Sequence, residues 1–239
     1  MSNVLVIGDT HAPCMLDGYI DFLNDTRKTF KCKEIVMIGD LVDWHSISYH
    51  ESAPTASSAH DEFNKAYDQV QQIKKVFPRA TWLIGNHDCL PSRKAITAGL
   101  PQEVMRSYTA LWDLPKWEVV PRFGYHVIDG VMYTHGDKGV GRFPAAFHNA
   151  KAQFRSYVQG HVHQQAGINY YANERPDGEG GIVFGMNVGC GVDHSKAEMD
   201  YGRKFNQKPI ISCGVVEDGY YPSLIPMRLG AYKQGRFSR

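Results

Sequence analysis

The sequence lacks the features that mark membrane, fibrous and disulfide-stabilised proteins. Its apolar runs are short, and none approaches the roughly 20 residues that a membrane-spanning helix needs. The 5 cysteines are scattered, and an odd number suits free thiols in a reducing compartment better than a disulfide framework. No basic and apolar leader opens the sequence. We therefore expect a cytoplasmic protein with no membrane partner.

The sequence also lacks an excess of either charge. It contains 26 Lys and Arg against 25 Asp and Glu, which gives a net charge of +1. Domains that bind duplex DNA through its phosphates are usually strongly basic, so we expect no extended duplex-DNA surface. Hydrophobic residues make up 43% of the 239 residues, enough for a substantial core. The length favours one domain over residues 1–239.

The sequence does contain a pattern that recurs after its predicted strands. An apolar run is followed by glycine or a small polar residue, and then by a side chain that can bind a metal ion. The runs span residues 4–7, 35–38, 81–84, 131–134 and 156–159. The side chains that come after them are Asp9, His11, Asp40, Asn86, His135, His161 and His163. Because open α/β sheets bind ligands at the carboxyl ends of their strands, we expect these side chains to share one site.

The types of these side chains predict a pair of metal ions. A lone histidine after a strand is usually structural, and an aspartate after glycine usually forms a turn. Turn chemistry does not require Asp-x-His or His-x-His, so it does not account for the whole set. Carboxylate, amide and imidazole ligands without cysteine suit borderline divalent ions. The set is too large for one catalytic ion, and suits two ions about 3.5–4 Å apart that share a carboxylate and clamp a displacement at phosphorus.

The order of the motifs resembles the calcineurin-like metallophosphoesterase superfamily. The resemblance extends from Asp9 to His163 and rests on Asp9-x-His11, Gly39-Asp40-x-x-Asp43, Gly85-Asn86-His87-Asp88, His135 and Gly160-His161-x-His163. It implies an α/β fold, namely a metallophosphoesterase β-sandwich of two mixed sheets flanked by helices in α/β/β/α layers. It also implies that the closing hairpins of residues 182–229 contribute to the second sheet, followed by a basic tail at 230–239.

The resemblance implies a cofactor of two divalent metal ions, with Mn²⁺ favoured and Fe²⁺, Zn²⁺, Ni²⁺ and Co²⁺ as alternatives. The ligands that it implies for the first ion are Asp9, His11 and His163. Those that it implies for the second ion are Asn86, His135 and His161, and Asp40 would bridge the two ions. A hydroxide between the ions would attack the phosphate ester.

Two further residues have catalytic roles by the same resemblance. His87 would lie over the phosphate, where it would donate a proton to the leaving oxygen or a hydrogen bond to the phosphoryl group. Asp43 would orient the His87 imidazole, and the alternative for Asp43 is a helix N-cap. Asp88 is expected to cap a helix.

The departures from the family pattern bear on the substrate. Protein serine/threonine phosphatases of the superfamily carry arginine after the second aspartate of the Gly-Asp motif and glutamate after the histidine of the Asn-His motif. This sequence has Trp44 and Asp88 there, which favours a phosphodiesterase acting on nucleotides, cyclic nucleotides or short nucleic-acid ends. A phosphomonoesterase acting on small phosphates and an inactive scaffold of the same fold are the alternatives. A homodimer is kept as an alternative to a monomer.

Four residues near the motifs are candidates to contact the substrate. His45 and His50 lie in a ring-rich loop after Asp43 that could wall a nucleobase pocket, or could pack that loop onto the next helix. Arg93 and Arg142 come after the Asn-His-Asp motif and His135, and either could contact a phosphate or be a solvated surface charge.

The pattern of apolar residues also predicts individual elements. Helices are expected over residues 17–24, 58–77 and 101–111, the last opened by Pro101. Hairpins are expected over residues 125–134, turning at Asp129-Gly130, and over residues 210–229. A strand is expected over 182–188, and long loops over 44–59 and 172–181.

Overall fold

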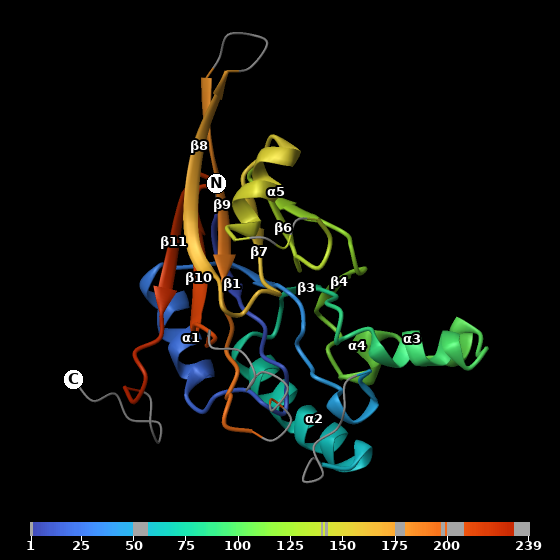
Figure 1. Cartoon of the computed structure of the whole chain (residues 1–239). Coiled ribbons are helices and arrows are strands. Elements are labelled where there is room, and N and C mark those ends of the chain that lie inside the picture. The colour runs from blue at the N-terminus through green and yellow to red at the C-terminus, as the bar shows by residue number, and fades with distance from the viewer. Residues whose placement is uncertain are drawn as a thin grey trace.

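The structure is a computed structural model that describes residues 2–49, 57–139, 141, 143–174, 180–196, 199 and 208–231, with the backbone alone at residues 173, 174 and 180. Two β-sheets lie face to face, with helices on both outer sides (Figure 1). His50, Arg142 and residues 232–239 of the predicted tail fall outside the described residues.

The first sheet has six strands in the order β11-β10-β1-β2-β3-β4. Its strands are β1 (Asn3–Ile7), β2 (Glu34–Met37), β3 (Thr81–Leu83), β4 (Glu118–Val120), β10 (Ser212–Glu217) and β11 (Tyr221–Pro226). The first four run parallel to one another, whereas β10 is antiparallel to both β1 and β11. The carboxyl ends of β1, β2 and β3 therefore meet at one edge of the sheet.

The second sheet has five strands in the order β5-β6-β7-β9-β8. Its strands are β5 (His126–Ile128), β6 (Val131–Thr134), β7 (Tyr157–Gln159), β8 (Ala166–Glu174) and β9 (Gly180–Val188). Strands β6, β7 and β9 are parallel, and the hairpin partners β5 and β8 are antiparallel to their neighbours. Both sheets are thus mixed, as the resemblance to the superfamily implies.

Alternate side chains of the central strands face different layers, as the period of a strand requires. In β1, Val4 and Val6 pack into a core between the two sheets, where they meet Val158 and Met186 of the second sheet. Leu5 and Ile7 belong instead to a larger core between the first sheet and its helices. These strands are apolar on both faces because both faces are covered.

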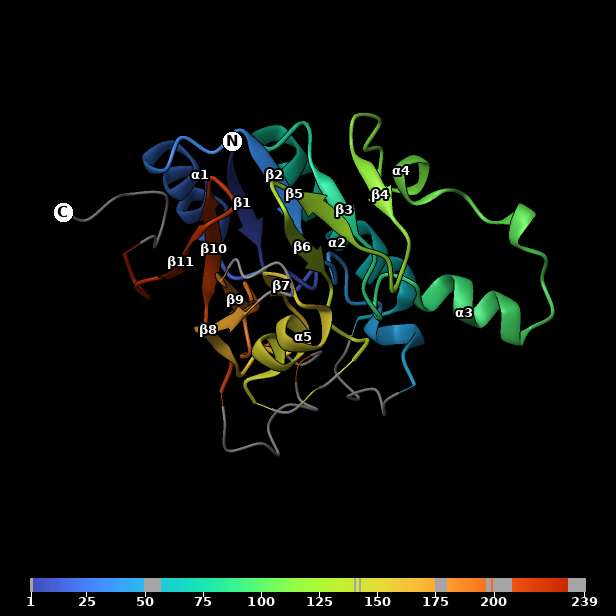
Figure 2. The same cartoon turned by 90° about the horizontal axis from the view of Figure 1, so that it is seen from above.

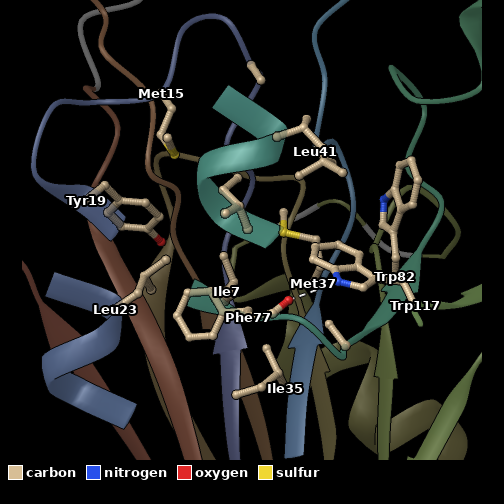
Figure 3. Close-up of a cluster of buried hydrophobic side chains, with 14 of the residues drawn as sticks. Ile7, Met15, Tyr19, Leu23, Ile35, Met37, Leu41, Phe77, Trp82 and Trp117 are labelled. Carbon is tan, nitrogen blue, oxygen red and sulfur yellow. Dashed lines mark hydrogen bonds between the residues drawn. The ribbon is translucent and has the colours of Figure 1, made fainter. Parts of the chain in front are cut away.

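The larger core is built around aromatic rings (Figure 3). Tyr19 reaches in from α1 and donates a hydrogen bond from its hydroxyl to the Ser212 carbonyl at 2.7 Å. Trp117 donates from its indole to the Phe77 carbonyl at 3.0 Å, so its one polar group is satisfied in the interior.

Helices cover both sheets and complete the α/β/β/α layers. Helices α1 (Tyr19–Thr29) and α2 (Ala59–Val76) pack on the first sheet, and α5 (Ala145–Gln153) packs on β7 and β9 of the second (Figure 2). Helix α3 (Leu90–Thr97) projects sideways from the body, followed by η2 (Gln102–Val104) and α4 (Tyr108–Leu111). A 3-10 helix, η1 (His45–Ile47), precedes α2, whose N-cap Ser58 accepts from the Asp61 amide at 3.2 Å.

One expectation about the sheets is wrong. The hairpin β10–β11 belongs to the first sheet, where Val4 to Val6 of β1 pair with Gly214 to Val216 of β10. The second sheet is closed instead by β8 and β9, and the sequence pattern does not predict β8. The predicted loop over 172–181 is therefore strand at both ends, and its residues 175–179 lie outside the described ones.

The helix boundaries also differ from the prediction in places. Helix α1 starts and ends later than the expected 17–24, whereas α2 matches 58–77 closely. Pro101 is the N-cap of the short η2 and not the first residue of a continuous helix, because the chain becomes extended at Met105 and a new helix is capped by Ser107. In the described part of the chain, no helix is both long and apolar enough to span a bilayer.

Candidate metal centre

Seven predicted side chains converge where the strands of both sheets end. They come after β1, β2 and β3 of the first sheet and β6 and β7 of the second. Backbone hydrogen bonds tie the ligand loops together, because the His11 amide donates to the Asp40 carbonyl at 2.9 Å and the Gly160 amide donates to the His135 carbonyl at 2.9 Å. The centre therefore lies across both sheets.

The ligand atoms form two groups that meet at one carboxylate. Asp9, His11 and His163 offer atoms within 4.8 Å of one another, and so do Asp40, His135 and His161. Asp40 Oδ2 lies 3.3 Å from His135 Nε2 and 3.6 Å from His11 Nε2.

Asn86 completes the predicted set. Its Oδ1 lies 3.0 Å from His135 Nε2, beside the second group. A third overlapping group contains His11, Asp40 and His87. The arrangement is compatible with a dinuclear divalent metal site, with Asp40 between the two groups.

Unpaired polar atoms test whether a metal ion fits these residues. The Nδ1 of His11 lies 2.7 Å from Asp43 Oδ1, so this nitrogen carries the ring proton and Nε2 presents a lone pair. That Nε2 and Asp9 Oδ1 are both buried without a hydrogen-bond partner. Leaving such atoms unpaired in the interior is costly, and a cation would satisfy both.

His135 has the same arrangement from the other sheet. Its Nδ1 lies 3.1 Å from the Ile38 carbonyl oxygen, which can only accept, so Nδ1 carries the proton. Its Nε2 faces Asp40 and Asn86. Metal-binding histidines commonly donate their second N–H to a carbonyl or carboxylate, which fixes the ring orientation.

The backbone at the centre is strained and crowded. His11, Asp40 and His161 have φ values of 46°, 45° and 63°, in the left-handed region that is uncommon for residues other than glycine, although Asp and His adopt it more often than most. A Cβ at Gly160 would collide with the Asp9 carboxylate, and one at Gly85 with the Asp40 carboxylate. The small residues of these motifs therefore let the ligand loops approach closely.

Burial and the neighbouring imidazoles shift the pKa values of the centre. Burial by itself raises the pKa of the Asp40 carboxyl, but the imidazoles of His135, His87 and His11 outweigh it and hold this pKa well below its usual range. The pKa of His11 is lowered by burial and by His87. The pKa of His161 is lowered by burial and by His135.

His87 lies beside the two groups and is held by Asp43. Its Nδ1 lies 2.8 Å from the Asp43 carbonyl oxygen and 3.0 Å from Asp43 Oδ1, so Nδ1 carries a proton and Nε2 is left for other partners. Burial opposes the charged form, but Asp40 and Asp43 raise the pKa of His87 to about 10. The N-cap alternative for Asp43 is wrong, because η1 begins after Trp44 and has no side-chain cap on its own N-cap residue.

Sequence analysis missed Glu62, which holds the loop after Asp43. This carboxylate of α2 is only 2% exposed, and it accepts from the backbone amides of His45 at 2.5 Å and Ser46 at 2.9 Å. A buried glutamate is unusual because a charge in the interior needs partners. No local signal in the sequence identifies it, since its partners lie 16 and 17 residues away.

Asp88 joins two motif loops and does not cap α3. Its carboxylate accepts from the amides of Val42 at 3.2 Å and Gly85 at 2.9 Å, and from the Trp82 indole at 3.1 Å. Burial and the nearby Asp40 raise the pKa of Asp88 to about 7.

His194 is a further histidine that sequence analysis did not single out. The preceding residue, Asp193, donates a hydrogen bond from its backbone amide to the Cys14 carbonyl at 2.7 Å. This bond holds the segment that contains His194 beside the loop that contains His11. Burial, with the nearby His163, lowers the pKa of His194 to about 4.

The candidate substrate residues are less closely gathered than the ligands. His45 is 3% exposed, and the neighbouring Trp44 ring stacks on Phe63 at 6.0 Å, so this part of the loop packs onto α2. Arg93 lies on α3 with its guanidinium 4.9 Å from the ring centre of Tyr49. The other two candidates, His50 and Arg142, are not among the described residues.

Two of the comparisons with known proteins add no support to this geometry. The search of curated proteins finds no match. Among solved structures, the chain is similar to a single-residue variant of Vps29 from Entamoeba histolytica, with 10% identity, a TM-score of 0.41 and coverage of 95% of this chain and 99% of that one. It is also similar to Yfce, a phosphoesterase from E. coli, with 12% identity, a TM-score of 0.42 and coverage of 90% and 88%. At these TM-scores neither likeness adds to the argument.

The decisive comparison is with a family model. The model described as calcineurin-like phosphoesterase matches residues 2–123, which is more than half of the chain. The match spans the motifs from Asp9 to His87 and ends before His135. The chain belongs to the calcineurin-like phosphoesterase family.

Proposed function

We propose that this chain is a dinuclear metal-dependent phosphodiesterase. The observation that supports it most is the meeting of two ligand groups at the buried carboxylate of Asp40, with unpaired buried atoms on Asp9 and His11. Two divalent ions, when bound, would polarise the phosphate ester and make the attacking water a stronger nucleophile. Mn²⁺ is the proposed ion because the carboxylate and amide oxygens of the set suit it, with Fe²⁺, Zn²⁺, Ni²⁺ and Co²⁺ as the alternatives.

The ligands divide between the ions as the groups suggest. Asp40 would be shared, and the others would hold one ion each: Asp9, His11 and His163 on one side, and Asn86, His135 and His161 on the other. Asp43 and the Ile38 carbonyl would keep His11 and His135 in the tautomer that offers Nε2 to the ion.

His87 would act as the general acid. Asp43 fixes the proton on its Nδ1, so the proton on Nε2 can pass to the leaving oxygen of the ester. The carboxylates of Asp40 and Asp43 favour the protonated imidazole that this step needs. Asp43 would therefore be a positioning residue for two imidazoles at once, His87 and His11.

The diester preference is supported by the residue directly after Asp43. Trp44 stacks on Phe63 and lies 5.6 Å, centre to centre, from Trp112, so an apolar ring occupies the position where the protein phosphatases carry arginine. A dianionic monoester would lack that cation here. Arg93 remains a proposed phosphate contact, with His45, His50 and Arg142 as further proposed substrate residues.

Hydrolysis of two chromogenic esters tests the proposal. Purified protein with Mn²⁺ should hydrolyse bis-(p-nitrophenyl) phosphate faster than p-nitrophenyl phosphate. The His87→Ala variant should retain both ions and lose roughly 10²–10⁴-fold in rate. A faster monoester rate would favour a phosphomonoesterase, and no hydrolysis of either ester with both ions bound would favour an inactive scaffold.

We also propose a single domain over residues 1–239 in the cytoplasm. Cys32, Cys89, Cys190 and Cys213 are buried free thiols, which suits a reducing compartment.

A further inference from the structure

Three exposed aromatic rings near the candidate centre are each in contact with a cation. Tyr49 is 55% exposed, Phe123 44% and Tyr125 39%. The Arg93 guanidinium lies 4.9 Å, and the Lys94 ammonium 3.8 Å, from the Tyr49 ring centre. Arg122 lies 4.4 Å from the centre of Phe123, and Lys138 lies 5.6 Å from that of Tyr125. We call these three pairs the cation–aromatic rim.

Contacts join the three pairs into one surface. Arg122 donates to Asp137 at 2.7 Å, next to Lys138 in the chain. It also approaches Cys89 Sγ at 3.5 Å, and the Arg93 amide donates to the Cys89 carbonyl at 3.0 Å in the first turn of α3. The Tyr49 pair is therefore linked through α3 to the Phe123 pair, and that pair through Asp137 to the Tyr125 pair.

The rim borders the candidate metal centre. Cys89 is two residues after His87, and Asp137 is two residues after His135. The rim thus flanks the side of the centre where His87 and the proposed second ion lie. A phosphate held at the centre would therefore lie beside this surface.

The charges of the rim are available to a ligand. Among the described residues, no carboxylate pairs with Arg93, Lys94 or Lys138, whereas Arg122 is offset by Asp137. The rim therefore presents free positive charge beside aromatic faces, although the whole chain carries only +1.

We propose that the cation–aromatic rim binds single-stranded nucleic acid and directs one of its phosphodiesters to the metal centre. Alternating rings and cations match a strand in which bases alternate with phosphates, since bases stack on aromatic faces and phosphates pair with Lys and Arg. A duplex hides its base faces and would engage the cations alone. This inference rests on the proposed function, because it names the substrate class of the same centre.

Binding of a fluorescent phosphorothioate oligothymidylate, which resists hydrolysis, tests the rim directly. Anisotropy titrations with the Mn²⁺-loaded full chain should show Tyr125→Ala and Tyr49→Ala each weakening binding by about ten-fold, with Tyr125→Phe close to wild type because it keeps the ring. Lys138→Ala should reduce the slope of log affinity against log salt by about 0.7, the share of one phosphate contact.

Matched controls come from exposed residues elsewhere. Tyr221 is 62% exposed on β11 and Lys28 is exposed on α1, and alanine at either should leave oligothymidylate binding unchanged. Equal binding by rim and control variants, or a duplex of the same length bound as tightly as the single strand, would overturn the inference. Hydrolysis of bis-(p-nitrophenyl) phosphate by the wild type tests the proposed function separately, so failure of the rim and failure of the enzyme are distinguishable.

Discussion

The two sheets contribute different chemistry to the candidate centre. Every carboxylate in it comes after a strand of the first sheet, whereas the second sheet contributes imidazoles alone. The first-sheet residues are Asp9, His11, Asp40, Asp43, Asn86 and His87, and the second-sheet residues are His135, His161 and His163. The negative charge that attracts two cations is therefore concentrated on one side of the sandwich.

The supporting contacts differ in the same way. Buried carboxylates hold the first-sheet loops, with Glu62 bonded to the amides of η1 and Asp88 joining the loops of Val42 and Gly85. Neutral amides support the second-sheet side, where Asn149 donates to Gln159 at 2.8 Å and Asn187 accepts from the Ala146 amide at 3.0 Å. We therefore expect a change at the shared first-sheet carboxylate to affect both ions and the rate, and a change at a second-sheet imidazole to lower the occupancy of one ion.

The largest effect is expected at the carboxylate that both groups share. Asp40→Asn keeps the size of the side chain but removes its charge, so neither ion retains its common ligand. Hydrolysis of bis-(p-nitrophenyl) phosphate should fall by about 10³-fold or more, because several kcal/mol of metal-dependent stabilisation are lost. Metal analysis by mass spectrometry should show fewer than two ions per chain, and a variant with two ions and normal rate would rule out the bridging role.

A change on the second sheet should have a more selective effect. His161→Ala removes a ligand from one group and leaves Asp9, His11 and His163 in place. We expect about one Mn²⁺ per chain and a rate lower by about 10²-fold, partly recovered at high Mn²⁺. Loss of both ions together would show that the two groups are not separable, and the contrast between the sheets would then fail.

The smallest effect is expected at Glu62, whose hydrogen bonds within the described part of the chain go to backbone amides and not to a predicted ligand. Glu62→Ala leaves the amides of His45 and Ser46 without their acceptor, so the loop that presents Asp43 to His87 should shift. We expect kcat to fall about 10- to 100-fold with both ions retained and KM little changed.

The conservative variant separates positioning from folding at this site. Glu62→Gln keeps one acceptor oxygen and should recover part of kcat, whereas Glu103→Ala, at an exposed residue, serves as the control. If Glu62→Ala lowers the melting temperature while kcat of the folded protein is normal, the residue has a structural role alone.

The strand-end motifs are predictable because each is local. A short apolar run followed by glycine and Asp, Asn or His predicts a buried strand and the residues at its carboxyl end. Val4 to Ile7 are indeed buried on both faces. The two mixed sheets and the flanking helices agree with the fold that the resemblance of the motifs implied.

The features that the sequence does not reveal depend on contacts between distant segments. Pairing of β10 with β1 joins residues more than 200 positions apart, and nothing in the hairpin itself selects the first sheet. Helix α5 is not predicted, because its N-terminal amides are capped by Gln165 and Asn187 from elsewhere in the chain and not by a local cap residue. From the helix pattern alone, Glu62 is expected on the exposed face of an amphipathic helix. Its burial depends on the distant loop whose amides it accepts hydrogen bonds from.

The most direct test of the central claim is anomalous diffraction from a crystal grown with Mn²⁺. The account predicts two anomalous peaks, one among Asp9, His11 and His163 and one among Asn86, His135 and His161, both within bonding distance of Asp40. A single peak, or two peaks that do not share Asp40, would contradict the dinuclear centre on which the proposed phosphodiesterase depends.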